Sequence, residues 1–86
     1  MFVRELKYRG LPCAVAIAPG GAYLVNGYGA QLLRLDAAGG VLAVTGRSGS
    51  GRGEFAEAHD VAVGAAGEIY VADSSNAVLQ KFVPAP

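Results

Sequence analysis

The residues best suited to chemistry lie close together in the stretch GRSGSGRGEFAEAHDVAV, residues 46–63. Its first half combines glycine and serine with Arg47 and Arg52, a composition that could cradle a phosphate. His59 and Asp60 follow, and an imidazole beside a carboxylate suits a metal site or proton transfer. The alternative interpretation is structural, namely a glycine-rich connector between two folded units.

The sequence around this stretch favours the connector. It contains no G-x-x-x-x-G-K-[ST] motif, and no helical periodicity follows whose amino end could hold an anion. We therefore assign residues 47–58 as a connector. Arg47 and Arg52 are then solvated charges that would be available to an anionic ligand.

Composition limits the partners of this 86-residue chain. Seven basic and seven acidic residues leave no net charge, which speaks against nucleic acid and anionic membranes. No apolar stretch approaches the roughly 20 residues of a membrane-spanning helix. The start, MFVRELKYRG, is too charged for a signal peptide, so a cytoplasmic location is expected by default. Yet 52% of the residues are hydrophobic, which predicts apolar surface that a partner covers.

An internal repeat organises the chain. Residues 14–25 align with residues 60–71, so that Gly21 falls on Gly67 and residues 23–25 fall on 69–71. Residues 31–35 then align with 78–82 after a slip of one residue, which gives a period of 46 to 47 residues. Both units read as short strands separated by turns rich in Gly, Asn, Asp and Ser, and this pattern predicts an all-β fold.

Each unit is expected to form a four-stranded antiparallel blade of a β-propeller, because four strands in 40–45 residues are typical of that architecture. The first blade covers residues 11–46. The second covers 59–86 and lacks its own outer strand. Residues 1–10 resemble the outer strand at 40–49 and are expected to complete a blade of a neighbouring chain.

The second unit resembles the NHL repeat, and the first unit matches it more loosely. The matching elements are a Gly-x-Phe lead at 53–55, Val61-Ala62-Val63, Gly67, the strand Ile69–Asp73, the turn 74–76 and the strand 78–82. A more distant resemblance links HDVAV, residues 59–63, to propellers of the peptidylglycine amidating lyase type. That resemblance implies zinc held by histidines from separate blades.

Two blades leave two apolar faces uncovered, so self-association is expected. Head-to-tail copies close into a ring when the rotation per copy divides the circle. NHL propellers are most often six-bladed, and the resemblance therefore favours a homotrimer over a dimer or a tetramer. The alternative is that these blades belong to a longer chain.

The sequence favours a ligand- or protein-binding scaffold over an enzyme, although enzymatic activity stays open. Candidate ligand-binding residues are Tyr28, Arg47, Arg52 and Asp60, which lie in loops or near the expected channel. The alternative is a metal-dependent lyase or hydrolase, in which copies of His59 hold zinc or another divalent metal on the axis. Cys13, at the position equivalent to His59, is interpreted as a small hydrophobic residue.

Overall fold

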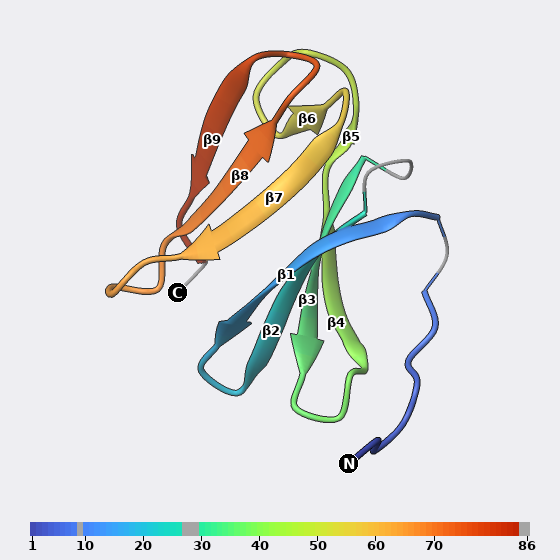
Figure 1. Ribbon diagram of the computed structural model, residues 1–86. Helices are drawn as coiled ribbons and strands as arrows, with labels where there is room; N and C mark the ends of the chain where they lie inside the picture. Colours follow the sequence, from blue (N-terminus) through green and yellow to red (C-terminus); the bar gives the residue numbers. More distant parts are fainter. Residues whose placement is uncertain (9, 27–29, 85–86) are drawn as a thin grey trace.

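The prediction of an all-β chain is confirmed by a computed structural model that describes residues 1–8, 10–26 and 30–84 (Figure 1). The first unit is a four-stranded antiparallel sheet whose strands, in spatial order, are β1 (Pro12–Ala18), β2 (Gly21–Asn26), β3 (Gln31–Asp36) and β4 (Val41–Thr45). The second unit is a three-stranded antiparallel sheet formed by β7 (Ala58–Val63), β8 (Ile69–Asp73) and β9 (Val78–Phe82). Between them, β5 (Arg47–Ser48) and β6 (Glu54–Phe55) form a short parallel pair. None of the described residues forms a helix that could cross a bilayer.

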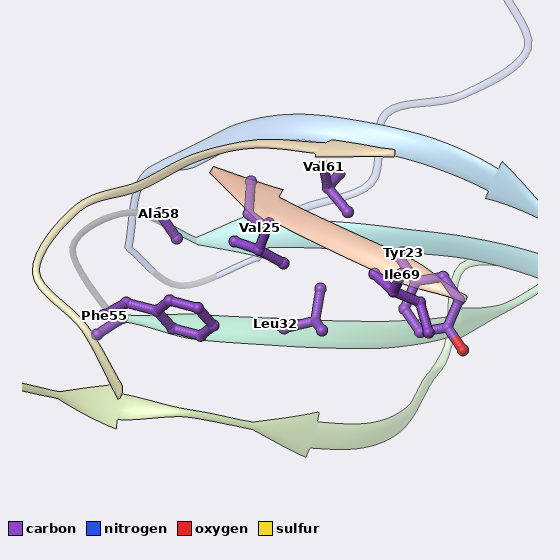
Figure 2. Packing of buried hydrophobic residues seen from close by; sticks show 9 residues of the cluster. Tyr23, Val25, Leu32, Phe55, Ala58, Val61 and Ile69 are labelled. Atoms are coloured by element: carbon purple, nitrogen blue, oxygen red, sulfur yellow. The ribbon is translucent and has the colours of Figure 1, made fainter. Parts of the chain in front are cut away.

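The two sheets stack face to face around one apolar core, with β1 and β2 against β7. Figure 2 shows side chains of both sheets pointing into this core, together with Phe55 of the connector. The buried members are Tyr23, Val25, Ala30, Leu32, Phe55, Ala58, Val61, Ile69 and Val71. Ala14, Ala16 and Ala18 of β1 pack against the same core.

Each sheet has two faces, because successive residues of a strand point to opposite sides. We call the side of the first sheet that carries Tyr23 and Val25 its front face, and this face is buried against the second sheet. The opposite side, the back face, carries a second cluster formed by Leu24, Leu33 and Leu35. The second sheet buries its own back face, with Val61 and Val71, against the front face of the first.

The strand registers correct the alignment of the repeat. Tyr23 pairs with Arg34, and Tyr70 pairs with Lys81 in the same way 47 residues later. The alignment of residues 23–25 with 69–71, and of Gly21 with Gly67, is therefore wrong by one residue. Gly20 is the true counterpart of Gly67, since both have positive φ, 80° and 87°.

The two units differ in length by one residue, and this additional residue lies in the first turn of the second unit. Two residues, 19 and 20, separate the last pair of β1 and β2, whereas three residues separate Gly64 from its partner Glu68. A slip of one residue moves every side chain of a strand to the other face. The period is thus 46 residues before this turn and 47 after it.

Residues 1–8 form no strand within the chain and lie beside the outer edge of the first sheet (Figure 1). The Tyr8 hydroxyl donates a hydrogen bond of 2.7 Å to the Gly39 carbonyl oxygen, and Arg4 donates one of 3.2 Å to that of Ala38. The Tyr8 ring packs against the cluster on the back face. The pairing of residues 1–10 with a neighbouring blade remains a prediction.

Candidate functional site

The connector is attached to the second sheet through the carboxylate of Asp73, the last residue of β8. This side chain is 1% exposed. It accepts hydrogen bonds from the amides of Ala56 at 2.8 Å and Glu57 at 3.0 Å. Asn76 donates two more, from its backbone at 3.2 Å and its side chain at 2.9 Å. The carboxylate therefore fixes both the connector and the turn that begins β9.

These donors decide the charge state of Asp73. Burial acts to raise the pKa of the carboxyl, because it disfavours the charged form. The amides of Glu57, Ala56 and Asn76 act in the opposite direction, and together they hold the pKa below its ordinary value of 3.8. Asp73 is consequently an ionised structural group and has no acid–base partner among these contacts.

The glycine-rich loop binds a carboxylate of its own chain. The Glu54 carboxylate accepts a hydrogen bond of 3.0 Å from the Gly51 amide. It also forms an ion pair with Arg47, whose Nε donates to it at 2.8 Å. The Gly51 amide and then Arg47 lower the pKa of Glu54. Since this carboxylate takes the loop amide and the arginine that a phosphate would use, the geometry favours the structural connector.

Two further side chains bind the connector, one from β9 and one from the turn before it, and the sequence analysis did not identify them. Gln80 accepts from the Gly53 amide at 2.9 Å and donates to the Glu54 carbonyl at 2.8 Å. Asn76 Nδ2 donates to the Gly49 carbonyl at 2.9 Å. These partners are 26 or 27 residues apart, so no local pattern reveals them.

The candidate ligand-binding residues have different surroundings. Arg47 is held by Glu54, whereas Arg52 is exposed in the connector. His59 and Asp60 are exposed at the start of β7, where the Asp60 carboxylate accepts from the Val61 amide at 2.9 Å. Tyr28 lies outside the described residues. The three described candidates that are not held by an ion pair are thus exposed, Arg52 in the connector and His59 and Asp60 on β7.

In residues 1–8, 10–26 and 30–84, no three His, Cys, Asp or Glu side chains are placed to hold a metal ion. Cys13 is half-buried against the core, and its thiol donates to the Leu11 carbonyl at 3.3 Å. A site at His59 would require symmetry-related copies.

Two sheet faces carry exposed apolar side chains and are candidate interaction surfaces. On the back face of the first sheet, Ile17 is 81% exposed and Val15 is 60% exposed. Leu79, on the front face of the second sheet, is 65% exposed. A hollow of about 440 Å³ on the first face includes Val15, Ile17 and Leu35 in its lining.

The chain consists of two stacked antiparallel sheets that are joined by a connector. The strand pairs of the first sheet recur in the second, so the fold is that of a repeat protein. The family model of the NHL repeat matches residues 55–82. These residues therefore form an NHL repeat that runs from the buried Phe55 to the end of β9. No curated protein matches the chain.

Proposed function

We propose that this chain is a self-associating NHL-repeat scaffold that binds a protein or a small ligand. The NHL repeat at residues 55–82 and the stacked sheets support a propeller-type binding scaffold. Self-association is the further step, and it depends on the two uncovered faces.

The single observation that carries self-association is the equivalence between buried and exposed faces. In each sheet the front face has the same composition, because Tyr23, Leu32 and Arg34 recur 47 residues later as Tyr70, Leu79 and Lys81. The first set is in contact with the second sheet, whereas no sheet formed by the described residues lies beside the second set. The back faces show the converse relation. The back face of the second sheet is buried against the first sheet, whereas the described residues that pack on the back face of the first sheet belong to the segment 1–8 and to no sheet.

A second copy supplies both missing surfaces. Its back face would pack on the front face of this copy, in the way that the two sheets already pack within the chain. At roughly 25 cal/mol per Å² of apolar area, covering several hundred Å² contributes on the order of 10 kcal/mol. Head-to-tail contacts of this kind close into rings. Three copies would supply six sheets, and we propose this trimer.

The position of residues 1–8 supports their assignment as an outer strand for the preceding copy. Leu6 lines the hollow on the exposed back face of the first sheet. Ala43 and Thr45 of β4 line the cavity at the matching back face of the second sheet. The amino-terminal segment therefore lies against the back face of the first sheet, just as β4, the outer strand of the first sheet, lies against the back face of the second sheet.

The ligand would bind at the end of the ring that carries the connectors. Arg52 is exposed in the connector, and His59 and Asp60 are exposed at the start of β7. Tyr28, which lies outside the described residues, is kept as a candidate from the sequence alone. The chemistry of this end is mixed, with a cation, an imidazole and a carboxylate, which suits a polar small ligand or a protein loop.

Mass measurement by light scattering over a range of concentrations tests self-association. The wild-type chain is expected at three times 8.7 kDa. Ile17→Lys places a charge on the exposed back face and is expected to yield monomers, because the buried charge would lack a partner. Ser50→Lys, which adds the same charge in the exposed connector, is the matched control and should leave the mass unchanged. A wild-type monomer at every concentration would refute the proposal.

The exposure of His59 supports a second candidate, a metal-dependent lyase or hydrolase. In a threefold ring, three copies of this side chain would approach the axis, and three imidazoles are a common zinc ligand set. Metal analysis of the assembled protein tests the idea, with His59→Ala as the comparison. Equal zinc content in the two proteins would exclude an axial site.

A further inference from the structure

A cavity of about 340 Å³ lies between the two sheets of one chain. Tyr23 and Arg34 line it from the front face of the first sheet. Phe82 and Val83 line it from the second sheet. At this contact the first sheet contributes a cation and an aromatic ring. The residues of the second sheet that line the cavity with them are uncharged.

The hollow on the exposed back face of the first sheet is built from the equivalent residues of the other repeat. Leu35 and Asp36 line it, and they stand 47 residues before Phe82 and Val83. Gly20 also lines it and is the counterpart of Gly67, which lines a neighbouring part of the crevice between the sheets. The hollow therefore corresponds to the side of the cavity that the second sheet provides. Its lining contains no tyrosine and cation like those that the first sheet contributes to the cavity.

The opposite side exists on the front face of the second sheet. Tyr70 and Lys81 are the counterparts of Tyr23 and Arg34 in strand register. Lys81 Nζ lies 5.9 Å from the centroid of the Tyr70 ring, so the ammonium and the ring already form one unit. Resting on the self-association proposed above, we infer that Tyr70 and Lys81 of one copy occupy the hollow of the next copy, where Lys81 pairs with Asp36.

Charge complementarity singles out this pair. Within the chain, the position opposite Arg34 is Val83, and between copies the position opposite Lys81 is Asp36. The turn fixes the Asp36 carboxylate, because Oδ1 accepts from the amides of Ala38 at 2.9 Å and Gly40 at 2.8 Å. A front-to-front contact would instead bring two copies of Lys81 together. Opposite charges therefore favour the head-to-tail arrangement over that alternative.

Charge reversal in two backgrounds tests the pair. Lys81→Glu places a carboxylate opposite Asp36 and is expected to weaken self-association about tenfold or more, measured by sedimentation or light scattering across a dilution series. Asp36→Asn removes the charge and keeps an oxygen for the turn amides. In the Asp36→Asn background, the same Lys81→Glu change is expected to weaken self-association less than about threefold.

Arg34→Glu is the matched control, because the described residues that line the cavity with Arg34 include no carboxylate. Its effect is expected to be the same in both backgrounds. An equal effect of Lys81→Glu with and without the Asp36 charge would overturn the pairing while leaving self-association intact. A wild-type chain that stays monomeric would overturn both proposals, so the two failures are distinguishable. Thermal unfolding of each variant confirms that it remains folded.

Discussion

Asn26 and Asp73 occupy the same place in the two sheets, 47 residues apart. Each is the buried last residue of the second strand of its sheet. Asn26 Oδ1 accepts a hydrogen bond of 2.9 Å from the Leu11 amide, and Asp73 accepts one of 2.8 Å from the Ala56 amide. In both units a polar side chain at the end of this strand therefore holds the segment that leads into the sheet.

Asp73→Asn is expected to destabilise the fold by about 2 kcal/mol, because an amide group replaces one acceptor oxygen by a donor facing other donors. Urea unfolding followed by circular dichroism measures the change. Asp60→Asn is the control, since this exposed carboxylate accepts only from the neighbouring Val61 amide. The assignment of Asp73 as an anchor fails if the two variants unfold at the same urea concentration.

Acid is expected to weaken the native state through the same carboxylate. The pKa of Asp73 is lowered in the fold, so the unfolded chain binds more protons as the pH falls. The contribution of Asp73 is fully present above its ordinary pKa of 3.8 and is lost as the pH falls through the lower native pKa. The free energy of unfolding, measured as the pH is lowered through this range, should fall more steeply for the wild type than for Asp73→Asn. Parallel curves would contradict the assignment.

Ala77 is expected to be a position where glycine stabilises the chain. Its φ is 57°, in the left-handed region that costs a residue with a Cβ atom about 1 kcal/mol. Its side chain is exposed, so Ala77→Gly loses little packing, and a net gain of about 0.5 kcal/mol is expected. Ala66→Gly, in an exposed turn without positive φ, should lower stability instead. Thermal unfolding of the two variants distinguishes them.

Removal of residues 1–8 is expected to weaken self-association without unfolding the sheets. The segment is largely exposed, and its contacts are those of Arg4, Leu6 and Tyr8 with the turn 36–40 and the packing of the Tyr8 ring on the back face of the first sheet. If it also completes a neighbouring sheet, its loss opens the edge of β9 and raises the dissociation constant. Tyr8→Phe, which removes only the hydroxyl, is the milder control. Unchanged association after the deletion would argue against strand exchange.

The all-β fold and the NHL repeat could be predicted from the sequence because short apolar runs and turn residues are local signals. The offset between the repeats was harder to place. Residues 23–25 and 69–71 are alike in type, and a turn longer by one residue is invisible until strand pairs are known. The roles of Gln80 and Asn76 depend on contacts with residues distant in sequence, and no local pattern encodes them.

The candidate site was predicted only in part for a similar reason. Arg47 looked like a free charge in the sequence, but it binds Glu54 seven residues later. The glycine spacing suggested an anion site without revealing that the chain provides the anion. The cluster of exposed residues at the start of β7 followed directly from the position of His59 and Asp60 before an apolar strand.

The unequal turns at 19–20 and 65–67 lie at the opposite end of the sheets from the connector (Figure 1). In a ring of three chains, short and long turns would alternate around that rim. Six similar sheets would then present a surface with threefold and not sixfold symmetry. A molecule that recognises this rim would find three equivalent places, each set by a single additional residue.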